Sequence, residues 1–160
     1  MRINTVTVAA SAIAIMGLGL GLVAQQKPAP ASTAASTKVT VYKTSSCGCC
    51  KLWVDHMKAN GFDVQAMDVS SADVRAVSKA AGLKDEDASC HTSKIGSYTV
   101  EGHVPAADIK RMLNEKPAIA GLSAPGMPQG SPGMEQGTKE PYDVIAFKKD
   151  GTSTVYAKHK

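Results

Sequence analysis

Aromatic residues and blocks of basic charge are scarce in this sequence. Its 160 residues include four Tyr, two Phe and one Trp, and the formal net charge is only +4. Nucleic-acid-binding domains usually carry a dense basic patch, so the composition gives little support for a nucleic-acid partner. No internal repeat is visible either, and the sequence therefore does not indicate a repeat protein.

Charge is absent from the stretch between about Val6 and Ala24, which is rich in Ala, Gly, Ile and Leu and follows a short start that carries Arg2. This pattern predicts a secretory signal peptide over residues 1–24. The run is barely long enough to span a bilayer, so an uncleaved membrane anchor is the alternative. No cysteine directly follows the run, as a lipoprotein would require. In either case we expect the rest of the chain to lie outside the cytoplasm.

Residues 25–37 read QQKPAPASTAAST, which is Pro, Ala, Ser and Thr with no apolar periodicity. Such a composition is typical of a flexible linker. The remaining residues, 38–160, are enough for one domain with its own hydrophobic core. We therefore predict a signal peptide or anchor, a linker and a single folded domain.

The first half of this domain alternates between strand and helix patterns. Val39–Tyr42 is a β-branched run typical of a strand. Apolar residues at helical spacing then predict a helix that starts near Cys49 or Cys50. A second strand pattern and a second helix pattern follow. Strand, helix, strand and helix in this order predict a parallel βαβ unit. The predicted elements cover about 39–42, 49–60, 62–69 and 70–82.

The second half is predicted to contain two hairpins and a helix. One hairpin turns at Gly96-Ser97 and the other at Asp150-Gly151, with β-branched or aromatic residues on both sides. Pro105 is a typical first residue of a helix. Residues 117–141 contain Gly and Pro at many positions, so we expect a long loop there.

This order of elements, with a cysteine loop opening the first helix, is that of a thioredoxin-like fold. The strand at 39–42 leading into Cys47-x-x-Cys50 resembles the N-terminal half of a glutaredoxin. In that fold a loop with a cis-proline precedes the third strand and lies against the active-site cysteines. The corresponding segment here is Ser89–Thr92, which has no proline. We therefore expect Cys90 to lie beside the Cys47–Cys50 loop.

Three of the four cysteines are crowded into Cys47-Gly48-Cys49-Cys50, and the fourth, Cys90, is followed directly by His91. Outside the cytoplasm, four cysteines would usually form two structural disulfides. Adjacent cysteines such as Cys49 and Cys50 are poor cross-links, because short loops restrict the unfolded chain little. A structural-disulfide domain that binds a partner is thus one hypothesis, and a reactive or metal-binding site is another.

A series of motifs occurs in order along the chain, namely Cys47-Gly48-Cys49-Cys50, Trp53, His56, Ser89-Cys90-His91-Thr92, Glu101-Gly102-His103-Val104-Pro105 and the run from Pro125 to Met134. With these motifs the chain resembles the CopG-like copper-resistance proteins, long catalogued only as a metal-binding domain of unknown function. The resemblance covers essentially all of residues 38–160. It implies a periplasmic thioredoxin-like protein that binds copper through its cysteines, with partners among copper chaperones or exporter components.

The chemistry of the residues agrees with this resemblance. Thiolates are soft ligands that select Cu(I), zinc or iron–sulfur clusters, and a helix N-terminus favours the thiolate form. Four-thiolate zinc sites use two separated pairs of cysteines, whereas here three sulfurs lie within four residues. Such crowding suits sulfurs that bridge several Cu(I) ions. We therefore predict a copper site of more than one ion formed by Cys47, Cys49, Cys50 and Cys90.

Four further residues are weaker candidates for copper ligands. His91 follows a predicted ligand, and His103 precedes the helix-opening Pro105. Met127 and Met134 each follow Gly in a Pro/Gly-rich loop, and a thioether is a weak, soft ligand for Cu(I). The alternative is that both methionines hold the loop against the body, as a lid over the cysteines.

Five other side chains are predicted to have no role in metal binding. They are a packed or capped His56, a solvated His159, a core Met67, a core Met112 and a Trp53 that packs beside the cysteine loop.

Three functions fit the sequence. The first is a copper-binding protein that holds Cu(I) and cycles it with Cu(II). The second is a thiol–disulfide oxidoreductase in which Cys47 attacks and Cys50 resolves; Cys49 and Cys90 would then be dispensable. The third is the structural-disulfide domain. The first two are linked if two-electron oxidation of the thiols reduces incoming Cu(II), because metal binding needs reduced thiolates.

Overall fold

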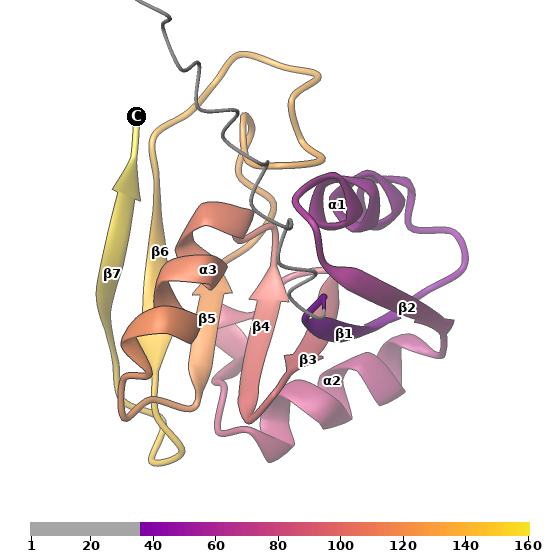
Figure 1. Ribbon diagram of the computed structural model, residues 1–160. Coiled ribbons are helices and arrows are strands. Elements are labelled where there is room, and N and C mark those ends of the chain that lie inside the picture. Colours follow the sequence, from indigo (N-terminus) through magenta and orange to yellow (C-terminus); the bar gives the residue numbers. More distant parts are fainter. Residues whose placement is uncertain (1–35) are drawn as a thin grey trace, which may run out of the picture. The chain divides into compact units, whose positions relative to one another are not determined.

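The computed structural model describes residues 36–160, whose elements are arranged around one mixed β-sheet (Figure 1). The predicted signal peptide over 1–24 and most of the predicted linker over 25–37 lie outside the described residues. Within residues 36–160 the sheet has seven strands in the order β2-β1-β3-β4-β5-β6-β7. In chain order the elements are β1 (Lys38–Lys43), α1 (Gly48–Ala59), β2 (Asp63–Asp68), α2 (Ser71–Ala80), the 3-10 helix η1 (Asp85–Asp87), β3 (His91–Ile95), β4 (Tyr98–Gly102), α3 (Ala106–Glu115), β5 (Gly121–Ala124), β6 (Tyr142–Phe147) and β7 (Ser153–His159).

The first half of the domain forms the predicted βαβ unit. β1 and β2 are parallel, with Val39 opposite Val64 and Val41 opposite Ala66, and α1 connects them. Side chains alternate between the two faces of a strand, so Val39 and Val41 are both buried on one face. The predicted α/β class and single domain are confirmed, while the thioredoxin-like assignment stays a prediction.

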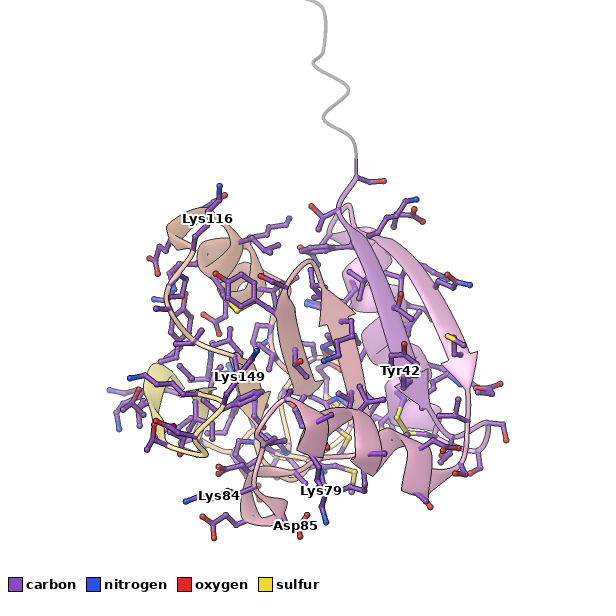
Figure 2. All side chains as sticks on the ribbon, turned by 90° about the horizontal axis from the view of Figure 1, so that it is seen from below. Tyr42, Lys79, Lys84, Asp85, Lys116 and Lys149 are labelled. Carbon is purple, nitrogen blue, oxygen red and sulfur yellow. A yellow bond between two sulfur atoms is a disulfide. The ribbon has the colours of Figure 1, made fainter. Side chains whose placement is uncertain are left out.

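Helices cover both faces of the sheet (Figure 1). Trp53 from α1 and Ile109 and Met112 from α3 are fully buried in one hydrophobic cluster on the first face. On the other face, the Thr92 hydroxyl oxygen of β3 lies 3.2 Å from the Val74 carbonyl oxygen of α2. Figure 2 shows the molecule from the side on which α2 lies. The central strands are therefore buried on both sides, and Met112 lies in the core as predicted.

The two predicted hairpins are confirmed. β3 and β4 pair antiparallel across the turn at Gly96-Ser97. β6 and β7 pair antiparallel across Asp150-Gly151.

The prediction of one long loop over residues 117–141 is wrong at its start. Gly121–Ala124 form β5, which pairs parallel with β4 and antiparallel with β6. All four residues of β5 are buried. The sequence gives little sign of this strand, because GLSA is short, contains neither alternation nor a β-branched residue, and lies between Pro- and Gly-rich segments.

Two side chains lie elsewhere than predicted. Met67 was expected in the core, but it is 41% exposed because β2 is an edge strand with little cover. His159 was expected to be solvated, but its Nε2 lies 2.7 Å from Asp108 Oδ2 and its ring stacks on Tyr142. The C-terminal strand is thereby tied to α3.

No helix within residues 36–160 is long and apolar enough to cross a bilayer.

We predict that Leu122→Ala lowers the free energy of unfolding by about 2–5 kcal/mol, because it leaves a cavity where a fully buried side chain packs in β5. Leu52→Ala is the matched control, since Leu52 is 42% exposed and its loss should change stability by less than about 1 kcal/mol. Urea unfolding followed by Trp53 fluorescence measures both. Equal effects of the two substitutions would contradict the placement of β5 in the core.

Candidate metal centre

The cysteine loop forms the N-terminus of α1. The helix begins at Gly48, one residue earlier than predicted, and Cys47 is its N-cap. The Cys50 N–H donates a hydrogen bond of 3.3 Å to Cys47 Sγ, so a sulfur takes the place that an oxygen occupies in ordinary caps. Cys47 and Cys50 form a disulfide, whereas Cys49 and Cys90 are free.

Cys90 lies immediately before β3 and faces the cysteine loop, as predicted. Its Sγ is 3.5 Å from Cys50 Sγ and 3.9 Å from Cys49 Sγ, and Cys49 Sγ is 3.5 Å from Cys47 Sγ. All four sulfur atoms lie within 4.8 Å of one another. The fold thus brings one sulfur from a position 40 residues further along the chain to three that are neighbours in sequence.

Two imidazoles extend this group of sulfurs. His103 Nε2 lies 3.1 Å from Cys90 Sγ, and His91 Nδ1 lies 3.4 Å from the same sulfur. His103 Nδ1 is 2.8 Å from the Pro132 carbonyl oxygen, which can only accept, so Nδ1 carries the proton and Nε2 presents a lone pair to Cys90. Cys90, His91 and His103 therefore form a second set of three donor atoms within 4.8 Å that shares Cys90 with the first.

His91 is held neutral by its surroundings. Its ring is fully buried, 4.6 Å from the Trp53 ring and 5.1 Å from that of His103. Burial, with smaller contributions from His103 and Lys43, lowers the pKa of His91 to about 3. Its Nε2 has no hydrogen-bond partner among the described residues. A neutral imidazole is the form that binds metal, so His91 needs no proton loss to act as a ligand.

The Cys90 thiol is the reverse case. Burial, and then the nearby Cys49, raise the pKa of Cys90 to about 12. At neutral pH this thiol keeps its proton in the absence of a cation. A metal ion that binds here must displace that proton, and its own charge offsets the loss of solvation of the thiolate.

The Pro/Gly-rich segment after β5 packs on the cysteine helix. Gly133 has φ +86°, and a Cβ built on it would lie 2.8 Å from the Cys49 carbonyl oxygen and 2.9 Å from the Trp53 nitrogen. This close approach explains why glycine is needed there. A pocket of about 500 Å³ lies between segment and helix, lined among others by Cys49, Leu52 and Met134.

The candidate residues from sequence thus divide into two groups. The structure brings Cys47, Cys49, Cys50, Cys90, His91 and His103 together, and Met134 shares a pocket with Cys49. Met127 is 53% exposed and lines no part of that pocket. His56 accepts a hydrogen bond of 3.1 Å from the Ala106 N–H, in keeping with the predicted packed and capped role.

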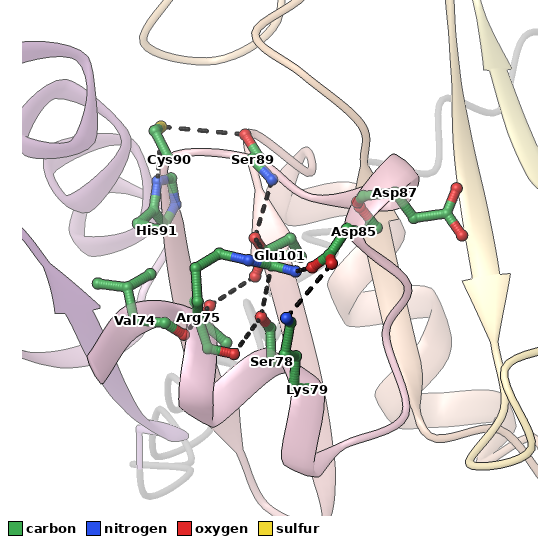
Figure 3. Close-up of polar contacts among 12 residues, drawn as sticks. Val74, Arg75, Ser78, Lys79, Asp85, Asp87, Ser89, Cys90, His91 and Glu101 are labelled. Carbon is green, nitrogen blue, oxygen red and sulfur yellow. Dashed lines mark hydrogen bonds and ion pairs between the residues drawn. The ribbon is translucent and has the colours of Figure 1, made fainter. Parts of the chain in front are cut away.

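Sequence analysis named Glu101 only within a motif and gave it no role, but this residue is a fully buried carboxylate beneath the metal-binding candidates (Figure 3). It accepts hydrogen bonds from the Ser89 N–H at 2.9 Å and from the Thr92 hydroxyl. Burial raises the pKa of Glu101, against the opposing effect of these two bonds. The signal was a charged residue within the alternating pattern of β4, directly before Gly102 and His103.

Comparison with solved structures finds two forms of a copper-resistance protein, CopG. Form 2 and Form 1 each share 41% sequence identity with this chain and superpose with a TM-score of 0.71. Both matches cover 78% of this chain, and they cover 99% and 98% of the respective CopG chains. This chain belongs to the CopG-like copper-resistance family.

Two other comparisons add detail to this assignment. A family model described as "Protein of unknown function, DUF411" matches residues 87–134. That range includes Cys90, His91, His103 and both loop methionines, but it leaves out the cysteine loop at 47–50. Comparison with curated proteins finds no match.

The donor set of this CopG-like site fits soft metal ions. It consists of four sulfurs and two neutral imidazoles, and no carboxylate belongs to either donor group within residues 36–160. Hard cations such as Mg²⁺ and Ca²⁺ take oxygen ligands, whereas thiolate and imidazole suit copper and zinc. His91 Nδ1 and His103 Nε2 lie 3.4 Å and 3.1 Å from Cys90 Sγ, so an ion bound at this sulfur would have both ring nitrogens within reach.

We predict that Gly133→Ala destabilises the protein more than Gly126→Ala does. Both residues have positive φ, so both substitutions carry backbone strain of about 1–2 kcal/mol. Only at Gly133 does the new Cβ also clash with backbone atoms, whereas nothing lies within 4 Å at Gly126. Chemical denaturation, with limited proteolysis at residues 125–141, measures the difference. Equal effects would contradict the close packing of this segment on α1.

The neutral His91 predicts how the stability of the metal-free protein depends on pH. The unfolded chain protonates this histidine below its ordinary pKa of 6.5, whereas the folded chain keeps it neutral down to about pH 3. The free energy of unfolding should therefore fall as the pH drops from 6.5 towards 3, by up to about 1.4 kcal/mol per pH unit for this group.

His91→Phe removes that dependence while keeping an aromatic ring beside Trp53. Urea unfolding of the metal-free protein at several values between pH 7 and pH 4 measures the two slopes. The substituted protein should lose less stability towards acid than the wild type. Parallel curves would show that His91 is not buried in its neutral form.

Proposed function

We propose that this protein binds copper for copper resistance or homeostasis, holding Cu(I) at a site with more than one ion. Cys47, Cys49, Cys50 and Cys90 would be the ligands. The observation that carries the proposal is the convergence of four sulfur atoms within 4.8 Å, one of which, Cys90 Sγ, lies beside two buried neutral imidazoles. Membership of the CopG-like copper-resistance family supports copper as the metal.

The placement of three sulfurs at the start of one helix favours several copper ions over one tetrahedral ion. Cys47 is the N-cap of α1 and Cys49 and Cys50 belong to its first turn, whereas four-thiolate zinc sites use two separated pairs of cysteines. A thiolate can bridge two Cu(I) ions, and bridging lets neighbouring sulfurs share their charge among the ions. When bound, Cu(I) supplies a soft centre that accepts two or three such ligands.

In this proposal the histidines and methionines differ in how close they lie to the sulfur atoms. His103 and His91 extend the sulfur group at Cys90, because both direct a ring nitrogen to its sulfur. Met134 lines the same pocket as Cys49 and is suited to a copper ion near the opening. Met127 is half-exposed, so any copper role for it needs a movement of the segment that carries it.

The disulfide between Cys47 and Cys50 connects copper binding to redox change. Two thiols that form one disulfide release two electrons and two protons. Two Cu(II) ions take up these electrons and become two Cu(I) ions, so the exchange balances without another reactant. The oxidised pair can no longer act as two thiolate ligands, and oxidation therefore weakens the site.

The same disulfide supports a second candidate function, a thiol–disulfide oxidoreductase that uses Cys47 and Cys50. Cys47 at the N-cap of α1 is in the position where a helix terminus favours the thiolate. In this function Cys49 and Cys90 would be dispensable. An ordinary oxidoreductase would not need Cys49 and Cys90 beside its reactive pair, whereas all four sulfurs are grouped here. The oxidoreductase is therefore the weaker candidate.

The cellular setting belongs to the proposal as well. We infer a thioredoxin-like domain over residues 38–160 that is exported to the periplasm by residues 1–24 and held on a linker over 25–37. If the leader stays uncleaved, it anchors the domain to the membrane. Partners would be copper ions and the copper chaperone or exporter components that deliver or receive them.

We predict that the reduced residues 25–160 bind more than one Cu(I) per chain in an anaerobic titration. Each of the four single Cys→Ser variants should bind fewer ions, because every sulfur is shared between metal centres. The measurement is the copper-to-protein ratio after competition with a chromophoric Cu(I) chelator. A single Cu(I) per chain, or uptake that survives the loss of Cys49 or Cys90, would contradict the shared site.

We also predict that Cu(II) added to the reduced protein without oxygen yields Cu(I) and a disulfide in a ratio of two to one. Copper oxidation state is followed by electron paramagnetic resonance, and disulfide by mass spectrometry of alkylated peptides. Cys47→Ser should lower the yield of both products together. Formation of neither product in the wild type would end the redox part of the proposal, and disulfide exchange that needs only Cys47 and Cys50 would favour the oxidoreductase.

A further inference from the structure

The backbone that carries Cys90 lies beyond the ends of the sheet ladders that flank it. On one side the last pair between β1 and β3 is Lys43 with His91. On the other side the last pair between β3 and β4 is Thr92 with Glu101. Ser89 and Cys90 are paired in neither ladder, so regular strand pairing does not fix the position of the Cys90 sulfur.

Glu101 supplies the missing attachment. Its Oε1 accepts a hydrogen bond of 2.9 Å from the Ser89 N–H, one residue before Cys90. Its Oε2 accepts a bond from the Thr92 hydroxyl, two residues after Cys90. One carboxylate therefore spans the cysteine from both sides, and its own backbone is held within β4. Figure 3 shows this arrangement beneath Cys90.

The carboxylate is in turn fixed from the α2 face. Arg75 Nη1 lies 3.8 Å from Glu101 Oε1, and Arg75 also pairs with Asp85 and donates to the Ser78 hydroxyl at 2.8 Å. Glu101 itself has no exposed surface. A buried ion pair is often no better for stability than apolar side chains of the same size. Stability therefore does not explain the presence of Glu101 next to Cys90, and a role at the site does.

Ser89 is tightly confined by two further contacts. A Cβ added to Gly102 would lie 2.4 Å from Ser89 Oγ, so only glycine permits this approach at φ +68°. The Ser89 hydroxyl also donates to the Gly126 carbonyl, and the Gly126 N–H donates to the Ala88 carbonyl at 2.9 Å. The segment before Cys90 is thereby linked to the start of the Pro/Gly-rich run that packs over the cysteine helix.

We propose that Glu101 is the positioning residue of the metal centre, which sets the place of Cys90 Sγ through its hydrogen bonds to Ser89 and Thr92. This inference goes beyond the ligands and rests on the proposed copper site for its effect on metal binding. Glu101 touches no sulfur, and it acts by keeping Cys90 within reach of Cys49, Cys50 and His103. Residues that orient ligands in this way typically change metal affinity by about 10–100-fold when they are replaced.

The test compares two replacements of Glu101 in the full domain. Glu101→Gln keeps an oxygen for the Ser89 N–H and offers an amide N–H to the Thr92 oxygen, so that the Thr92 hydroxyl proton is free to turn to the Val74 carbonyl. Glu101→Leu fills similar space but accepts no hydrogen bond. We expect Glu101→Gln to bind Cu(I) as the wild type does, and Glu101→Leu to bind at least about tenfold more weakly.

A second readout is independent of copper. The alkylation rate of Cys90 in the reduced, metal-free protein is measured by peptide mass spectrometry, with Cys49 as the internal reference. We expect the ratio of Cys90 to Cys49 alkylation to rise in Glu101→Leu, because the backbone on either side of Cys90 is released, and to stay unchanged in Glu101→Gln. Glu101→Asp, which withdraws the carboxylate by one carbon but keeps its charge, should raise the ratio too and serves if the leucine variant does not fold.

Val144→Ala controls for a general loss of stability, because it opens a cavity in β6 without touching this network. It should leave both the Cu(I) affinity and the alkylation ratio unchanged while the protein remains folded. The inference is overturned if Glu101→Leu or Glu101→Asp behaves like the wild type, if Glu101→Gln fails as they do, or if Val144→Ala produces the same changes. A wild type that binds no Cu(I) overturns the proposed function, and the alkylation ratio still decides the role of Glu101.

Discussion

The contact between Cys90 and the N-terminus of α1 is the constraint on which the rest of the site depends. It brings the half-buried thiol of Cys90, immediately before β3, to within 3.5 Å of Cys50 Sγ. Removal of this sulfur from water raises its pKa to about 12, so the thiol keeps its proton in the metal-free site. In the loaded site a metal cation takes the place of that proton. The two imidazoles beside it behave in the opposite way, since burial lowers their pKa values and leaves them neutral, with no proton to release when a metal binds. Metal binding and proton release are thus coupled at Cys90.

Much of the molecule serves to hold that contact. The β1–α1–β2 unit directs the cysteine loop to the end of the sheet, while β3 and β4 carry Cys90 and His103 to the same end. Trp53 packs between them, with its ring tilted against that of His91 and its Nε1–H donating to the Val104 carbonyl at 2.9 Å. From the other face, Glu101 and Arg75 fix the backbone before Cys90 (Figure 3). The site therefore depends on contacts from both faces of one sheet.

The sequence predicted the parts of this arrangement that have a local pattern. Helix and strand periodicity identified the βαβ unit and both hairpins, and the order of elements brought Cys90 to the cysteine loop. The parts that were missed depend on contacts between distant segments. β5 is a strand only because β4 and β6 flank it, as its four residues show no strand pattern of their own. The role of Glu101 was missed because a charged residue in a strand reads as a solvent-facing position until Ser89, Thr92 and α2 cover it. His159 was misjudged for the same reason, since Asp108 and Tyr142 come from other elements.

The central claim is that the sulfurs share several copper ions. X-ray absorption spectroscopy at the copper K-edge, on the anaerobically loaded protein, tests it most directly. The account predicts a Cu(I) edge, a first shell dominated by sulfur and a copper–copper distance short enough for bridging thiolates. A first shell of sulfur and nitrogen with no copper–copper scattering, at full loading, would mean isolated ions and would contradict the shared site.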